Sequence, residues 1–429
     1  MKGFKQKYVS ISSSFHPLYY VCKIVGLAPF CFTVSSDKGV EIDINIHSNI
    51  VGVSCSLLII CMLLGGTLCY FPVLASSRNP TPHFITSFMI SFPLTVLMAL
   101  LAITMNLTVN RHKFGELSRK LNDIDRALLK YGVSKRNVWS NIEMVLLLLI
   151  LIPWLCVDGW LWTDRMGFVG EATLRLSHLV QILVIIQFCK LTQFVWQSSK
   201  FLNKALRVSV RHDYERYRVI EKEFLNNPCS NMSSVNIISM TRRLPRTHNF
   251  PIVENVFQRR ATDKPKAFLN LLEIRCIYGN IYEAVGFINS IYGLSVLLEL
   301  VRNVLTVIVN ILQTMEVLKK PSLYGRPSLL YASLGVLWIV FLISREVAIA
   351  VSCHMATSEA KKIQDNVQCT LLRQHLRTET LEQLKLFSTQ LTVNRIEFSA
   401  FGFFTLNLST LSTFLVSVIT YIVVLEQIK

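Results

Sequence analysis

The last apolar segment of the chain carries hydroxyl and amide side chains at a spacing that could line a water-filled path. The segment covers residues 403–428, and Asn407, Thr410, Ser417 and Thr420 recur in it at intervals of three and seven. These intervals bring side chains to one face of an α-helix. Such a stripe suits a helix that lines an aqueous path, and it equally suits a tight contact between two helices. The residues alone leave both interpretations open.

Acidic and aromatic side chains in two other apolar segments could bind a small ligand. Asp158 lies near one end of the segment 142–163 and precedes Trp160. A carboxylate beside an aromatic ring suits a polyol or an amine, because the oxygen accepts hydrogen bonds while the ring packs against C–H groups. Trp160 equally suits the aromatic belt at a membrane surface. Trp338 lies too deep in its segment for that belt, and Tyr331 is one to two turns nearer the end, so the two are candidates for one pocket.

Several charges fall inside apolar segments, where each one needs a partner. Glu299 and Arg302 are three residues apart, so they can pair along one helix. Glu299 is also a candidate pocket residue. Arg345 and Glu346 are adjacent, so their side chains point in different directions and need separate partners.

Catalytic signatures are missing from the sequence. It contains no Gly-x-Ser-x-Gly, phosphate-loop or His-Glu-x-x-His pattern, and its 9 histidines are scattered without the spacing of metal ligands on a helix. An enzyme is therefore excluded as the main interpretation, and we expect no cofactor and no metal centre.

The elements that position these residues are membrane spans. Hydrophobic residues make up 52% of the chain, and the formal net charge is +17. The basic residues avoid the apolar segments and gather in particular loops, so membrane topology explains them better than nucleic-acid binding does. Seven segments are long enough to cross a bilayer: 48–72, 84–109, 142–163, 174–198, 281–312, 328–354 and 403–428.

The distribution of basic residues predicts the orientation. If the N-terminus is cytosolic, the cytosolic parts hold 34 of the 44 Lys and Arg residues. This excess indicates a cytosolic N-terminus and an extracellular C-terminus. The predicted organisation is then a cytosolic segment (1–46), spans one to four (47–198), a cytosolic loop with helical extensions and a linker (199–280), spans five and six (281–354), cytosolic amphipathic helices (355–402) and a seventh span (403–428).

The C-terminal residues resemble a known family. The ending Thr420-Tyr421-Ile422-Val423-Val424-Leu425-Glu426-Gln427-Ile428 resembles the terminal signature of insect gustatory receptors, which has Thr-Tyr, five mostly apolar residues, Gln and a large apolar residue. Glu426 and Ile428 depart from that pattern, where an apolar residue and Phe are usual. The insect odorant co-receptor ends similarly. At the other end, the run Tyr20–Glu41 is similar to the start of the fructose-type gustatory receptors.

The resemblance implies a fold and a mechanism. Members of this family are tetrameric, ligand-gated cation channels whose last helix surrounds the pore. It implies an all-α membrane protein with seven transmembrane helices in inverted topology, assembled as a homotetramer, or as a hetero-oligomer with related receptors, with a cytoplasmic helical anchor. The amphipathic cytosolic helices would form that anchor, although they could also pack within one subunit. The expected location is the plasma membrane of chemosensory neurons.

The resemblance also assigns roles to residues. By position in the motif, Val424, Gln427 and Ile428 match the pore gate. The expected pore-lining residues are Asn407, Thr410, Phe414, Ser417, Thr420 and Tyr421. The expected partners are a small tastant (a sugar or polyol, or a bitter plant compound), membrane lipids, and monovalent and divalent cations, with no nucleic acid.

Two other classes of membrane protein are testable alternatives. A G-protein-coupled receptor would have a cytosolic C-terminus and usually Asp-Arg-Tyr and Asn-Pro-x-x-Tyr motifs, which this sequence lacks. A secondary transporter would show internal repeats or broken helices in corresponding halves, and no such repeat is evident. The side of the membrane on which each terminus lies separates the first alternative from the channel.

Overall fold

The computed structural model describes residues 11–28, 30–37, 41–48, 50–76, 82–129, 139–226, 266–319, 328–372 and 378–427. The chain divides into two compact units. The first unit comprises residues 1–196, 283–357 and 397–429, and the second comprises 197–282 and 358–396. Every residue discussed below as a candidate for ligand binding or gating belongs to the first unit.

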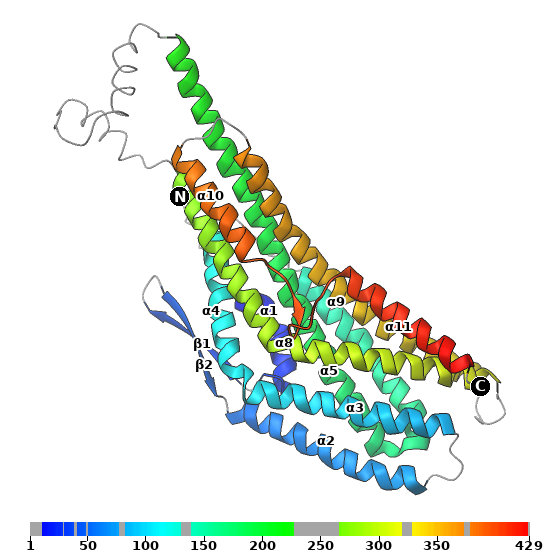
Figure 1. Ribbon diagram of the computed structural model, residues 1–429. Helices are drawn as coiled ribbons and strands as arrows, with labels where there is room; N and C mark the ends of the chain where they lie inside the picture. Colours follow the sequence, from blue (N-terminus) through cyan, green and yellow to red (C-terminus); the bar gives the residue numbers. More distant parts are fainter. Residues whose placement is uncertain are drawn as a thin grey trace. The chain divides into compact units, whose positions relative to one another are not determined.

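Helices dominate the first unit (Figure 1). It begins with α1 (Ile11–Ile24), α2 (Ile50–Ser76), α3 (Pro82–Leu107) and α4 (Asn110–Leu129). It also contains parts of three longer helices, α5 (Trp139–Asn226), α8 (Lys266–Lys319) and α9 (Ser328–Leu371), and it ends with α11 (Leu408–Gln427). Helix α5 is interrupted at Gly167, whose backbone is not helical (φ 73°, ψ 153°). The predicted boundary between the third and fourth segments coincides with this break.

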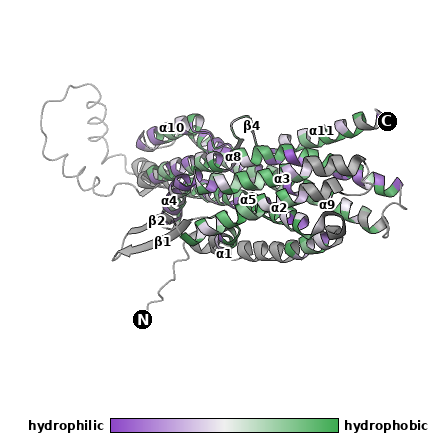
Figure 2. Ribbon diagram, turned by 90° about the horizontal axis from the view of Figure 1, so that it is seen from below, coloured by the Kyte–Doolittle hydropathy of each residue, from purple (hydrophilic) through white to green (hydrophobic). Residues whose placement is uncertain are grey.

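Four helical stretches within the described residues are long and apolar enough to cross a membrane: Ile50–Tyr70, Gly167–Arg211, Leu271–Lys319 and Ala332–Leu371. A fifth is obtained if Ser91–Leu107 and Asn110–Leu128, which meet at a bend of 67°, count as one span. The apolar part of α11, Leu408–Val424, is shorter. The hydropathy colouring shows long green stretches on α2 and α3, and both purple and green residues on α10 (Thr378–Val393) (Figure 2). The protein is thus a mostly helical membrane protein.

The chain also contains two antiparallel hairpins, so the expectation of a purely helical protein is wrong in detail. Strands β1 (Phe30–Asp37) and β2 (Glu41–Ser48) pair from Phe30 opposite Ser48 to Asp37 opposite Glu41. The prediction treated this stretch as part of a cytosolic segment. However, Ile42, Ile44 and Ile46 alternate with polar residues, and that alternation is typical of a strand.

The second hairpin leads into α11. Strands β3 (Ser399–Ala400) and β4 (Phe404–Thr405) pair across a tight turn in which Phe401 has φ 52° and Gly402 has φ 80°. This turn lies directly on α8, because a Cβ atom at Gly293 would come within 2.9 Å of the Phe401 nitrogen. The side-chain amide of Asn289, also on α8, donates to the Glu397 carbonyl at 2.9 Å. Helix α8 therefore positions the chain just before its last helix.

Helix α11 begins later than predicted. The predicted span started at 403, whereas the helix starts at Leu408 because residues before it form the hairpin. Asn407 provides the N-cap: its Oδ1 accepts from the backbone nitrogens of Ser409 at 2.9 Å and Thr410 at 3.2 Å. Asparagine is a preferred residue at this position, since it satisfies amide donors that have no partner within the helix.

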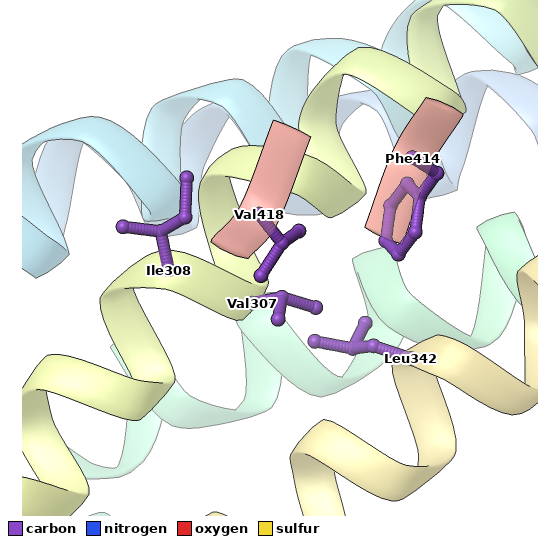
Figure 3. Packing of buried hydrophobic residues seen from close by; sticks show 5 residues of the cluster. All are labelled: Val307, Ile308, Leu342, Phe414 and Val418. Carbon is purple, nitrogen blue, oxygen red and sulfur yellow. The ribbon is translucent and has the colours of Figure 1, made fainter. Parts of the chain in front are cut away.

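One face of α11 packs into the hydrophobic core of the first unit. Phe414 and Val418 are buried against Val307 and Ile308 of α8 and Leu342 of α9 (Figure 3). Phe414 is only 5% exposed. Its burial fixes the rotation of α11 against α8 and α9, and it determines which of the remaining residues face outward.

The second unit contains the ends of the long helices and α10. Arg275 of α8 donates to Gln383 of α10 at 2.5 Å, and the Tyr278 hydroxyl donates to the Asn394 carbonyl at 2.8 Å. Phe387 of α10 is fully buried and meets the Tyr278 ring edge-on at 5.7 Å. The amphipathic pattern predicted for 355–402 therefore includes one packed helix with a buried face.

Candidate ligand cavity and terminal helix

The first unit encloses a cavity of about 110 Å³. Helices α3, α5, α8 and α9 contribute its walls. Most of the lining side chains are polar or aromatic: Ser91, Phe92, Thr95, Asp158, Glu171, Arg175, His178, Thr306, Asn310, Gln313, Thr314 and Trp338, with Leu174, Val309, Val317, Leu334 and Gly335 completing the wall. A concave site with several convergent polar groups is the usual form of a small-molecule site.

Asp158 organises the charged part of the cavity. It is fully buried, and its Oδ2 accepts a hydrogen bond of 2.9 Å from the indole nitrogen of Trp338. The same oxygen lies 2.6 Å from a guanidinium nitrogen of Arg175. Arg175 also pairs with Glu171 at 2.8 Å, one helical turn away. Two carboxylates and one guanidinium thus share the wall, an arrangement that offers both donors and acceptors to a ligand.

The aromatic part of the cavity is built around Trp338. Its ring lies 4.5 Å from the Trp154 ring and 5.1 Å from the His178 ring, measured between centroids. The Arg175 guanidinium carbon lies 5.6 Å from the centroid of the same indole, within the range of a cation–π contact. Contacts on several sides hold the Trp338 ring in place, and a fixed ring offers a ligand a flat surface at little entropic cost.

Helix α8 lines the cavity with a column of polar residues. Arg302, Thr306, Asn310 and Thr314 follow one another at intervals of four, which places them on one face of the helix. The last three line the cavity. Opposite this column, α9 comes close at Gly335, where a Cβ atom would lie 2.2 Å from the Thr314 hydroxyl oxygen. The glycine therefore sets how near the two helices come at the cavity wall.

A ring of buried charges surrounds Arg302, the first residue of this column. The Glu299 carboxylate accepts from Arg302 at 2.6 Å and also from Arg345 of α9. Asn303 accepts from Arg302 at 2.7 Å and donates to Glu346 of α9. Two guanidiniums and two carboxylates balance, which reduces the cost of burying them. The predictions that Glu299 pairs with Arg302 and that Arg345 and Glu346 need separate partners are both confirmed.

The structure separates the predicted pocket residues. Asp158 and Trp338 line one cavity, as expected of pocket candidates. Glu299 belongs to the charge ring and is not among the residues that line this cavity. Trp160 is 73% exposed and likewise lies outside the cavity lining. Tyr331 is in α9, but its side chain lies outside the part that the structure describes.

The predicted pore residues of α11 also fall into buried and exposed groups. Phe414 packs into the core of the first unit, and the Asn407 side-chain oxygen caps α11. Thr410 and Ser417 are half-buried at the flanks of the core face. Thr420 and Tyr421 are exposed, as are the predicted gate residues Val424 and Gln427. Ile428 lies outside the described residues.

Several cavity residues carried signals that sequence reasoning missed. The interval of four from Arg302 to Thr314 on α8 is visible in the sequence and is typical of a polar helix face. Glu171, Arg175 and His178 recur at intervals of four and three. The long α5 helix extends past the apolar segment, so these residues fall inside the folded unit.

Comparison with known proteins agrees with the resemblance at the C-terminus. The profile of the 7tm chemosensory receptor family matches residues 15–429. The gustatory receptor for sugar taste 43a of Drosophila melanogaster is 24% identical over 437 residues, covering 96% of this chain and 97% of the relative.

The fold has solved counterparts. The insect olfactory receptor OR5 of Machilis hrabei superposes with a TM-score of 0.62 at 13% identity, covering 97% of this chain and 98% of the other. The same receptor in complex with eugenol gives a TM-score of 0.58 at 15% identity, with the same coverage. Because the family profile spans nearly the whole sequence, the chain belongs to the 7tm chemosensory receptor family.

Proposed function

We propose that the protein is a gustatory receptor that opens a cation pore when a small polyhydroxylated molecule occupies the cavity of the first unit. The observation that carries this proposal is the lining of the cavity, in which the Trp338 ring lies beside the Asp158, Glu171 and Arg175 charges. An aromatic ring packs against the C–H face of a sugar, while charged and hydroxyl groups exchange hydrogen bonds with its hydroxyls.

The size and polarity of the cavity support this ligand class. Its volume of about 110 Å³ is small beside the ~300–1,000 Å³ of sites for drug-sized ligands. The α8 column adds the Thr306 and Thr314 hydroxyls and the Asn310 amide to the wall. The Thr306 and Thr314 hydroxyls donate to carbonyls of α8, and their oxygens can still accept hydrogen bonds. The hydroxyls of a sugar or polyol can donate those bonds, whereas a mainly apolar bitter compound cannot. The similarity to a Drosophila receptor named for sugar taste points to the same class.

The pore is assigned to α11 of several subunits around a common axis. The face of α11 opposite Phe414 and Val418 is open, and it carries large apolar residues such as Val416, Ile419 and Val423. Thr420, Val424 and Gln427 lie on the exposed part of the same helix. An assembly of four subunits would bring these helices together, with the C-terminal end of α11 forming the narrow part. Cation selectivity would be modest, since the exposed part of α11 offers the Thr420 hydroxyl and the Gln427 amide but no acidic ring at its centre.

The test is electrical recording from purified protein in a planar bilayer. We expect currents that appear on adding a sugar or polyol from a screened panel, carried by both monovalent and divalent cations. A bitter alkaloid panel applied to the same bilayer tests the competing ligand class. Purified protein that binds sugars but passes no current would overturn the channel, and currents evoked by apolar compounds alone would overturn the ligand class.

A further inference from the structure

Glu346 of α9 connects the charge ring to the start of the terminal helix. Its side chain is 2% exposed, and one carboxylate oxygen accepts from Asn303. Among the residues that the structure describes, the other oxygen, Oε2, has no hydrogen-bond partner. A buried carboxylate oxygen without a partner is unusual, because native structures satisfy nearly all such groups with protein or ordered water.

A small cavity adjoins Glu346. Its volume is about 10 Å³, and it is lined by Glu346, by Thr410, Leu406 and Leu411 near the start of α11, and by apolar residues of α8 and α9. This is about the volume that one water molecule needs. The space is therefore large enough for a single water between the carboxylate and the first turn of α11.

Thr410 supplies the second polar group of this cavity. Its hydroxyl donates to the Thr405 carbonyl at 3.1 Å and accepts weakly from the Asn407 backbone nitrogen at 3.3 Å. A hydroxyl oxygen has two acceptor lone pairs, so Thr410 can accept one further hydrogen bond. A water has two protons to donate, one for Thr410 and one for the Glu346 oxygen.

The charges nearby favour water over a cation. Arg302 and Arg345 stand in the ring with Glu299 and Glu346, so the two carboxylates are balanced by two guanidiniums. A metal ion would bring a third positive charge into a buried, neutral cluster, and Glu346 offers only one carboxylate oxygen without a hydrogen-bond partner. A neutral molecule that donates two hydrogen bonds matches the two acceptors.

We propose that one buried water bridges Glu346 of α9 to Thr410 of α11, and that this bridge holds the first turn of the terminal helix in its resting position. The consequence for gating rests on the proposed function, since the position of α11 matters for current only if that helix lines the pore. Glu346 and Thr410 act here as positioning residues.

The bridge also completes a chain of hydrogen bonds that links the wall of the ligand cavity to α11. The Asn310 amide donates to the Thr306 carbonyl at 2.7 Å, and the Thr306 hydroxyl donates to the Arg302 carbonyl at 2.8 Å. Arg302 bonds Asn303, and Asn303 bonds Glu346. A ligand that shifts the polar face of α8 would therefore also shift the charge ring. Movement of Glu346 in that ring would then break or keep the water bridge to the first turn of α11.

A pair of substitutions at one position tests the bridge. Thr410→Val keeps the shape of the side chain and removes the hydroxyl, whereas Thr410→Ser keeps the hydroxyl. Thr410→Val removes the bridge together with the hydrogen bond to the Thr405 carbonyl. We expect it to raise the current without ligand at least roughly 2- to 10-fold per channel at the surface, the range for one lost hydrogen bond, and we expect Thr410→Ser to match the wild type. The control is Thr413→Val on the same helix, whose exposed hydroxyl bonds only the Ser409 carbonyl at 3.0 Å.

Substitution of Glu346, the other end of the proposed bridge, completes a double-mutant cycle with Thr410→Val. Glu346→Met keeps the length of the side chain without a carboxylate, and adding Thr410→Val to it is expected to cause no further rise in the current without ligand. Additive effects would mean that the two residues act separately and would overturn the bridge. If Glu346→Met does not reach the surface, amide exchange in Thr410→Val still tests the bridge, because unchanged exchange over residues 408–416 would overturn it.

Hydrogen–deuterium exchange separates this inference from the proposed function. In the purified protein, we expect Thr410→Val to speed amide exchange over residues 408–416 roughly 2- to 10-fold, with Thr410→Ser and Thr413→Val unchanged. A wild type without ligand-evoked current overturns the proposed function, and the exchange result still tests the bridge. Unchanged exchange in Thr410→Val overturns the bridge even if the channel is gated by sugar.

Discussion

At the scale of single residues, Trp338 is held in the cavity wall by contacts on several sides. Trp338 is 8% exposed, its nitrogen donates to Asp158 at 2.9 Å, and four aromatic or guanidinium groups contact its faces and edges. A residue held this firmly contributes to a ligand site mainly through a surface that needs no rearrangement on binding.

We expect Trp338→Ala to raise the half-activating ligand concentration at least several-fold. Aromatic pairs contribute ~0.5–1.5 kcal/mol beyond area burial, and truncation also leaves a cavity. The measurement is a dose–response curve with surface protein quantified. Trp160→Ala is the matched control, because Trp160 is 73% exposed and lies outside the cavity lining. Equal shifts in both variants would argue that tryptophan loss acts through folding rather than through the cavity.

Glu299 has a structural role that is separable from the ligand. It is 2% exposed and accepts hydrogen bonds from Arg302 and Arg345. Removing one member of a buried ion network costs ~3–5 kcal/mol, since it leaves an uncompensated charge. We expect Glu299→Gln to lower the thermal stability of the purified receptor strongly.

The control for that change is an exposed acidic residue on the same helix. Glu283 pairs with Lys120 at 2.6 Å, and its side chain is 52% exposed. Exposed ion pairs contribute ~0–1 kcal/mol, so Glu283→Gln should leave the melting temperature nearly unchanged. A Glu299→Gln receptor as stable as Glu283→Gln would show that the ring does not support the fold.

At the scale of elements, the proposed gate lies at the exposed end of α11. Val424 is 43% exposed and Val423 is 48% exposed, and adjacent residues differ by about 100° around a helix. A narrow apolar throat sheds water and blocks ions. We expect Val424→Ala or Val424→Ser to pass current without ligand, and Val423→Ala to remain closed. Silent Val424 variants at normal surface levels would refute the gate.

The approach of α8 and α9 gives a prediction about the size of the cavity. A methyl group at Gly335 would lie 2.2 Å from the Thr314 oxygen, whereas one at Gly286 would meet no atom within 4 Å outside its own helix backbone. Gly335→Ala must therefore displace a cavity wall, and we expect weaker responses to ligand. Gly286→Ala is the control, because it gains helix propensity of ~1 kcal/mol without a clash. The readout is ligand-evoked current per surface receptor, and equal responses in the two variants would contradict the prediction.

The sequence predicted some elements well and others poorly, for identifiable reasons. Long apolar segments predict helices because the hydrophobic signal accumulates over many residues, and α2, α3, α8 and α9 follow the predicted segments. The start of α11 was misplaced, because Phe401–Phe404 is as apolar as a span and yet forms a hairpin turn. Local turn geometry of this kind depends on Gly293 of α8, more than 100 residues away.

The site was predicted only in part for a similar reason. Asp158 and Trp338 were singled out by their chemistry, but their hydrogen bond joins two helices, and no periodicity within one segment indicates such a pair. Phe414 and Asn407 lie on the predicted polar line, and the fold uses one for packing and the other as a helix cap. Spacing defines a face of a helix, whereas the neighbouring helices decide what that face contacts.

At the scale of the whole molecule, the orientation in the membrane decides between receptor classes. The distribution of basic residues predicts a cytosolic N-terminus and an extracellular C-terminus. We expect an epitope added at the C-terminus to be labelled on intact cells, with an N-terminal epitope labelled only after permeabilisation. The opposite pattern would favour a G-protein-coupled receptor and remove the basis for the channel proposal.

The charge ring has a consequence for how the protein enters the membrane during synthesis. Glu299 and Arg302 pair within α8, so this helix can partition into lipid with its charges already matched. Helix α9 brings Arg345 and Glu346, whose partners Glu299 and Asn303 are both on α8. Each unmatched charge opposes insertion by ~2.5–3.5 kcal/mol at the centre of a span. It follows that insertion of α9 into the bilayer requires α8 to be present beside it at the translocon, so that the two helices enter the bilayer as a pair.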